Sequence, residues 1–162
     1  MKLPPSAKVL KTRLPAQYAH NRREGGKVRS AKKVVCGEHY AAGDVVAGLV
    51  VRSRPVPFSV AIRGKNGGAP VRPKLKQWRI HVQAAARLAM AGRLPHIGPY
   101  EFRAKFLLTP AASMPDICNI VKSSEDALEG IVYINDKMCR RHRTEYDPAA
   151  DEDMAIIEVV AL

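Results

Sequence analysis

The stretch Met114–Lys137, MPDICNIVKSSEDALEGIVYINDK, contains residue types that could cut a phosphodiester bond. Asp116 precedes an apolar helical pattern, Lys122 lies inside that pattern, and Asp136 follows the next apolar run. Carboxylates at a helix start and a strand end can hold Mg²⁺, which polarises a phosphodiester and activates water. A nearby lysine can stabilise the negative charge that develops on the phosphoryl oxygens.

These side chains can act together only if the surrounding elements bring them together. Asp116 is a good N-cap for a helix, and Ile131–Ile134 has the apolar, β-branched character of a strand. A sheet can return the end of such a strand to the first turn of the preceding helix. The sequence therefore predicts that Asp116, Lys122 and Asp136 gather around one point.

The same residues also have an ordinary structural interpretation. Asp116 then only caps the helix, Asp136 only belongs to a turn, and Lys122 pairs with Asp126 one helical turn later. Cys118 lies one turn before Lys122 and shares its helix face. Residue types alone do not choose between a metal site and these local roles.

Upstream, the sequence predicts strand material followed by one long helix. β-branched residues begin near Val45, and the glycine-rich stretch Gly64–Gly68 predicts a hairpin loop. From Lys74 the apolar period becomes helical, and Gly92 ends it. Trp78 lies on the apolar stripe, so we expect it in the core.

Three strands are predicted in the second half of the chain. Tyr100–Thr109 alternates apolar and charged residues, which is typical of a strand. Residues 137–146 and 154–162 flank an acidic turn and are expected to form a hairpin. Together these patterns predict a mixed α+β fold, in which a small mixed sheet packs against two main helices.

Charge divides the chain unevenly. The 162 residues carry a net charge of +12, of which residues 1–54 hold +9. The start lacks a sustained apolar period, so we expect a basic, poorly ordered N-terminal extension over residues 1–47 and one domain over residues 48–162. Such an extension either binds a polyanion or only keeps the protein soluble.

No apolar run is long enough for a membrane span and no signal-peptide pattern is present, so we expect a cytoplasmic protein without membrane contact.

The stretch also resembles a known signature, that of the RusA-type Holliday junction resolvases of bacteria and phages. That pattern is approximately PDxDN-x-x-K, a DAL-x-G segment, a tyrosine-containing strand and a DD pair. The matching residues here are Pro115, Asp116, Asn119, Lys122, Asp126, Ala127, Leu128, Gly130, Tyr133 and Asp136. The resemblance extends more weakly over about residues 50–162.

The resemblance implies a homodimer that binds four-way DNA junctions and makes paired, Mg²⁺-dependent nicks during recombination and repair. It implies catalytic roles for Asp116, Lys122 and Asp136, and a metal site of Asp116, Asp136, Asn135 and Cys118, with Mn²⁺ as an alternative cofactor. DNA contacts are expected from Arg72, Lys74, Arg79, Arg140, Arg141 and Arg143.

Two positions depart from the family pattern. Cys118 replaces the second acid of PDxDN, and Asn135 replaces the first acid of the DD pair. An amide oxygen can still bind Mg²⁺, whereas a thiol is a poor ligand for a hard ion. The enzyme is then impaired, or Asp126 supplies a carboxylate, or Mn²⁺ serves better than Mg²⁺. The alternative function is a non-catalytic descendant that binds junctions without cutting them.

Overall fold

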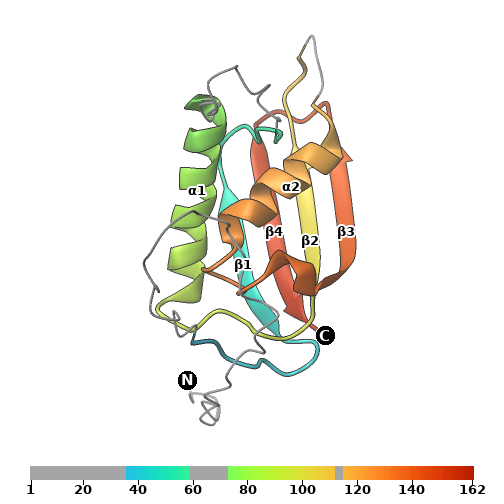
Figure 1. Ribbon diagram of the computed structural model, residues 1–162. Coiled ribbons are helices and arrows are strands. Elements are labelled where there is room, and N and C mark those ends of the chain that lie inside the picture. The colour runs from blue at the N-terminus through green and yellow to red at the C-terminus, as the bar shows by residue number, and fades with distance from the viewer. Residues whose placement is uncertain (1–35, 59–72, 112–114) are drawn as a thin grey trace, which may run out of the picture.

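The computed structural model describes residues 36–58, 73–111 and 115–162. In these ranges, two helices lie on one face of a four-stranded sheet (Figure 1). The elements are β1 Val45–Val51, α1 Pro73–Met90, β2 Tyr100–Leu107, α2 Ile117–Leu128, β3 Cys139–Asp147 and β4 Met154–Ala161. The predicted mixed α+β class is confirmed. Neither of the two helices combines the length and apolar character needed to cross a bilayer.

The strands lie in the order β1-β4-β2-β3. β4 is antiparallel to both β1 and β2, whereas β3 runs parallel to β2. The expected hairpin of the last two strands is therefore wrong, because β2 lies between them. Burial explains the order: β4 buries most of its apolar residues in the middle of the sheet, whereas the polar β3 has no buried residue and forms an edge.

The segment after α2 is a tight turn, so the strand expected at Ile131–Ile134 is also wrong. Gly130 has φ +79°, a left-handed conformation that glycine adopts without strain, and its N–H donates to the carbonyl of Tyr133 at 2.7 Å. Val132 and Tyr133 are fully buried. The apolar run therefore reflects a buried turn, which periodicity alone does not distinguish from a strand.

The core lies between the helices and the sheet. The buried residues of α1 are Leu75, Trp78, Val82, Ala86 and Met90, which confirms that the helix has an apolar stripe and that Trp78 lies in the core. The β2 rings Tyr100, Phe102 and Phe106 are fully buried and belong to the same core cluster. A helix with one apolar face on a sheet is stabilised mainly by this burial.

Most of the predicted N-terminal extension and the Gly64–Gly68 loop lie outside the described residues. The last part of the predicted N-terminal extension contacts the rest of the protein. The N–H of Glu38 donates to the carbonyl of Pro95 at 2.9 Å, and the hydroxyl of Tyr40 donates to the carbonyl of Leu94 at 3.1 Å. The division of the chain at residue 47 stays a prediction.

A polar cluster ties together the ends of three strands. Asp153 accepts hydrogen bonds from the backbone N–H of Thr109 at 2.9 Å and from the guanidinium of Arg54 at 3.0 Å. Arg54 also donates to the Thr109 hydroxyl at 3.0 Å. Burial opposes ionisation of Asp153, but the bonds from Thr109 and the charge of Arg54 outweigh it and lower its pKa.

We predict that Asp153→Asn lowers the free energy of unfolding at neutral pH by about 1–3 kcal/mol, because a charged acceptor is lost. The matched control is Glu152→Gln. Its partner Arg52 is 71% exposed, so this substitution should change stability little. Denaturant unfolding of the variants at pH 7 measures both effects.

The same contribution should depend on pH. Because the folded pKa of Asp153 lies below its unfolded value, the stabilisation is present above the unfolded pKa and is lost as pH falls through the folded pKa. The difference between wild type and Asp153→Asn should therefore shrink in acid. A difference of constant size down to the lowest pH of folded protein would contradict this role.

Candidate active site

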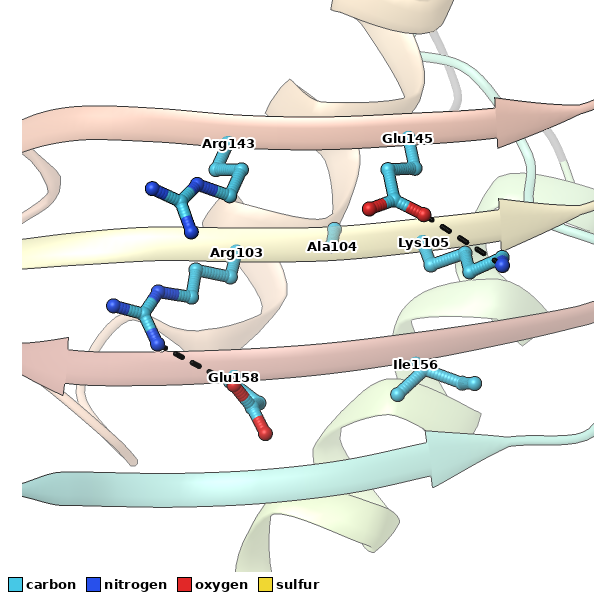
Figure 2. A pocket seen from close by; sticks show the side chains of 7 residues that line it. All are labelled: Arg103, Ala104, Lys105, Arg143, Glu145, Ile156 and Glu158. Atoms are coloured by element: carbon cyan, nitrogen blue, oxygen red, sulfur yellow. Dashed lines mark ion pairs between the residues drawn. The ribbon is translucent and has the colours of Figure 1, made fainter.

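The sheet face that the helices leave open carries a shallow hollow, with Arg103, Lys105 and Arg143 among its lining residues (Figure 2). Arg103 lies 3.9 Å from Glu158, and Lys105 lies 3.6 Å from Glu145. Positive and negative side chains thus face one another across the strands. None of the predicted catalytic residues lines this hollow.

Glu101 holds three arginines on the same open face. Its carboxylate accepts a hydrogen bond from Arg103 at 2.9 Å and lies 3.8 Å from Arg141 and 3.9 Å from Arg143. The hydrogen bond from Arg103 lowers the pKa of Glu101, the burial of its side chain opposes this shift, and the three guanidinium charges reinforce it. Glu101 therefore keeps a cluster of arginines in place beside edge strand β3.

The other predicted DNA-binding residues have different settings. Lys74 is exposed in the first turn of α1, and Arg140 is exposed on β3. Arg79 instead donates to Asp126 at 2.7 Å and ties α1 to α2, with only 28% of its side chain exposed. Arg72 lies outside the described residues. The DNA contacts of all six residues stay predictions.

At the start of α2, Asp116 is the N-cap, as the sequence predicted. One carboxylate oxygen accepts from the N–H of Cys118 at 2.8 Å and the other from the amide of Asn119 at 3.2 Å. An acid at this position also interacts favourably with the positive end of the helix dipole. The side chain of Cys118 is exposed beside it.

Lys122 makes the local pair that its spacing predicted. Its ammonium lies 3.8 Å from the carboxylate of Asp126 and 5.5 Å from the centre of the Phe58 ring. Asp126 also binds Arg79, so this carboxylate is already neutralised by two cations. Asp126 is therefore a poor substitute for the acids missing from the family pattern.

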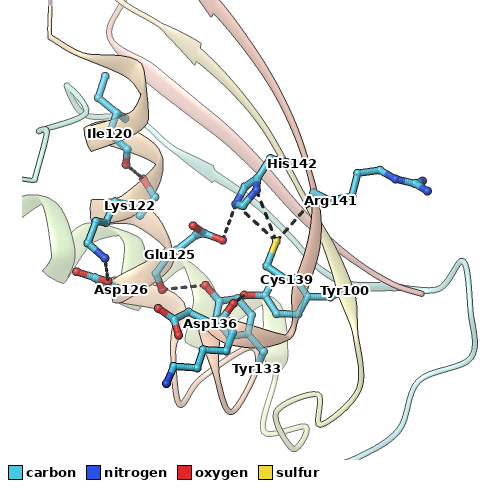
Figure 3. Close-up of polar contacts among 12 residues, drawn as sticks. Tyr100, Ile120, Lys122, Glu125, Asp126, Tyr133, Asp136, Cys139, Arg141 and His142 are labelled. Carbon is cyan, nitrogen blue, oxygen red and sulfur yellow. Dashed lines mark hydrogen bonds and ion pairs between the residues drawn. The ribbon is translucent and has the colours of Figure 1, made fainter.

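Asp136 does not return to the first turn of α2, and that geometric expectation is wrong. The hydroxyl of Tyr100 donates to the backbone carbonyl of Asp136 at 3.4 Å (Figure 3). Burial raises the pKa of Glu125, which lies in the last turn of α2, and the negative charge of the Asp136 carboxylate contributes to this rise. Glu125 follows Asp116 by nine residues, a rise of about 13 Å along a helix. The chain after α2 is folded into a turn by the hydrogen bonds from Gly130 to Tyr133 and from Ile131 to Leu128, so it does not run back over that length.

Asn135 has a capping role. Its side-chain oxygen accepts from the N–H of Lys137 at 2.9 Å and begins a short 3₁₀ helix, Asp136–Met138. The metal and catalytic roles of Asp116, Cys118, Asn135 and Asp136 stay predictions.

A second group of reactive side chains lies beside Asp136 and was missed from the sequence. His142 Nε2 lies 3.0 Å from Glu125 Oε1 and 3.5 Å from the sulfur of Cys139 (Figure 3). In the described part of the chain, these are the three residues whose His, Cys or acidic ligand atoms lie within 4.8 Å of one another. Residues three apart in a regular strand point to opposite faces, so no sequence pattern pairs Cys139 with His142.

Burial dominates the electrostatics of this group. It raises the pKa of Glu125, while the adjacent His142 opposes that shift. Burial and the charge of Glu125 together raise the pKa of the Cys139 thiol to about 11. Burial thus favours the neutral forms of both the Glu125 carboxyl and the Cys139 thiol.

Two stacked tyrosines, Tyr100 and Tyr133, contact the segments that carry Glu125 and Asp136. The rings of Tyr100 and Tyr133 lie 4.3 Å apart at an interplanar angle of 17°. Tyr133 donates its hydroxyl to the backbone carbonyl of Glu125 at 2.8 Å, while Tyr100 reaches Asp136. The pair therefore links the end of α2 to the start of β3.

Comparison with known proteins bears on this arrangement. A protein-family model described as "Endodeoxyribonuclease RusA" matches residues 55–159. The matched range contains α1, β2, α2 and β3 and most of β4, and thus both carboxylate-bearing segments. No curated protein matches the chain.

The capping role of Asp116 can be separated from any metal role by two substitutions. We predict that Asp116→Ala lowers the free energy of unfolding by about 1 kcal/mol, whereas Asp116→Asn leaves it nearly unchanged, because Asn is an equally good N-cap. Thermal or denaturant unfolding measures this difference. Equal losses in both variants would show that the negative charge, and not the cap, is what stabilises α2.

Proposed function

Since the chain belongs to the RusA endodeoxyribonuclease family, we propose that it is a metal-dependent endonuclease that nicks Holliday junctions and other branched DNA. The family match carries this proposal, because it spans the whole acidic signature together with α2, which this signature contains. The family acts on Holliday junctions; cleavage by this chain, its metal and its cytoplasmic location are our proposals.

Asp116, Lys122 and Asp136 are the proposed catalytic residues. A divalent ion, Mg²⁺ or Mn²⁺, would polarise the phosphodiester and activate water. Lys122 is 53% exposed and can reach a phosphate with its ammonium group. Arg140, Arg141 and Lys74, which are exposed, would bind the DNA backbone.

Within one chain, Asp116 and Asp136 do not fit one metal centre, because they lie at opposite ends of α2. We therefore propose a homodimer in which a centre containing both carboxylates is completed by the partner subunit. A two-fold dimer also matches the two equivalent strands of a four-way junction. Asn135 directly precedes Asp136 in the sequence, and Cys118 follows Asp116 by two residues. Because these two residues replace acids of the family pattern, the loss of two negative charges would weaken Mg²⁺ binding.

The second candidate function is a junction-binding protein without nuclease activity. The replacement of two family acids by Cys118 and Asn135 favours it, while the basic residues of the chain would still bind phosphates. A labelled four-way junction separates the two functions. Cleavage with Mg²⁺ or Mn²⁺ identifies the enzyme, and a mobility shift without cleavage identifies the binding protein.

For the enzyme, we predict that Asp116→Asn or Asp136→Asn abolishes junction cleavage and leaves binding equal or tighter, because a charge that repels phosphate is removed. Lys122→Ala should reduce the cleavage rate by about a hundredfold or more and the affinity much less. Single-turnover cleavage and mobility shifts measure the two quantities, with Glu152→Gln as the control. Normal cleavage by either Asp variant would remove that residue from the site.

We predict that Cys118→Asp tightens Mg²⁺ binding and raises cleavage by about tenfold, which corresponds to about 1.4 kcal/mol of barrier. The added carboxylate supplies a hard ligand and a favourable pair with Lys122 one turn later. The wild type should prefer Mn²⁺ over Mg²⁺ more strongly than the Asp variant does. Cys118→Ser controls for loss of the thiol, and all proteins must be kept reduced. No gain from Asp over Ser would place position 118 away from the metal.

The shared metal centre can be tested with mixed dimers. A heterodimer of one Asp116→Asn chain and one Asp136→Asn chain retains one complete centre only if each centre combines Asp116 of one chain with Asp136 of the other. We predict that such heterodimers, purified through two different tags, nick one strand of the junction. Both mutant homodimers should be inactive. An inactive heterodimer would mean that each chain uses its own two carboxylates.

A further inference from the structure

Glu125, Cys139 and His142 bring a carboxylate, a thiol and an imidazole to one point beside the end of α2 (Figure 3). We propose that these three residues bind a thiophilic divalent cation, Zn²⁺. This inference goes beyond the proposed nuclease site, whose expected ligands are other residues. It also stands independently of that function, because it rests only on the geometry of this cluster.

The spacing of the three ligand atoms suits tetrahedral zinc. Zinc bonds of 2.0–2.3 Å to oxygen, nitrogen and sulfur place neighbouring ligand atoms about 3.3–3.8 Å apart. The observed separations are 3.0 Å between His142 and Glu125 and 3.5 Å between His142 and Cys139, and all three atoms lie within 4.8 Å of one another. Side-chain adjustments of about 1 Å or less would therefore accommodate the ion.

An irregularity in β3 creates this spacing. Tyr100 pairs with Cys139 but Glu101 pairs with Arg141, so Arg140 is an extra residue in the β3 strand. One extra residue shifts the alternation of side chains by one position. Cys139 and His142 consequently point to the same face, although they are three residues apart.

The surroundings hold the ligands in place before any ion binds. Glu125 is mostly buried, with 14% of its side chain exposed, and its backbone carbonyl accepts the hydrogen bond from Tyr133. The His142 ring lies 5.9 Å from the buried ring of Phe102, its cross-strand neighbour. Fixed neighbours of this kind reduce the entropy that a metal site loses on binding.

The chemistry of the donors selects the ion. Thiolate and imidazole favour Zn²⁺ over Mg²⁺, which prefers oxygen ligands in an octahedral arrangement. Three protein ligands leave a fourth position, and one of the three, His142, is half-exposed to solvent. Water or a phosphate oxygen could occupy it. Without a metal, the same contacts would form only a hydrogen-bonded cluster, and this is the outcome that an experiment must separate.

Co²⁺ is a suitable probe, because a thiolate bound to it produces a charge-transfer absorption band. We expect tag-free, reduced, full-length protein to bind one Co²⁺ per chain with this band, and Zn²⁺ to displace it. Cys139→Ser should abolish the band, and His142→Gln or Glu125→Gln should weaken Co²⁺ binding by at least about tenfold. Cys36→Ser is the matched control, since its exposed thiol belongs to neither proposed metal site and should not contribute.

A second measurement uses the wild-type protein and does not depend on the folding of a variant. Zn²⁺ should slow alkylation of Cys139 by at least about tenfold, as judged by mass spectrometry of the peptides, and leave the exposed Cys36 unprotected. Absence of bound Co²⁺, a band that survives in Cys139→Ser, or equal alkylation of Cys139 with and without Zn²⁺ would overturn the proposal. None of these readouts involves DNA cleavage, so a failure of the nuclease proposal would not affect them.

Discussion

The stacked rings of Tyr100 and Tyr133 determine where α2 ends and β3 begins. One ring belongs to the central strand β2 and the other to the buried turn, so the stack fixes that turn against the sheet. Both hydroxyls then donate to backbone carbonyls of residues that carry acids, Glu125 and Asp136. The positions of these acids, and of Cys139 just beyond them, follow from a contact between two residues with no chemistry of their own in the proposed reaction.

Patterns confined to a few residues predicted their part of the structure correctly. The N-cap at Asp116, the pairing of Lys122 with Asp126 and the burial of Trp78 each depend on neighbours within about one helical turn. The order of the strands depends on contacts between distant segments. An apolar run such as Ile131–Ile134 indicates burial, and only the rest of the fold decides that the buried segment is a turn.

The candidate site follows the same division. The family pattern identified Asp116 and Asp136 along the chain, but their separation by the length of α2 depends on where the turn ends. The proximity of Cys139 and His142 depends on one extra residue in β3, opposite β2. No periodicity in the sequence marks that residue, because Arg140 lies among other exposed, charged residues.

The position of β4 affects how the chain can fold. The strand β4 lies between β1 and β2. In the β1–β4 pair, Val45 lies opposite Val160, which follows it by more than a hundred residues. Contacts of such high sequence separation slow folding, because a long loop must close before they form. During synthesis β1 and β2 therefore remain without their common neighbour until Met154–Ala161 has left the ribosome. The sheet is completed only once β4 has emerged, and the nascent chain depends until then on helix formation and local apolar contacts to remain compact.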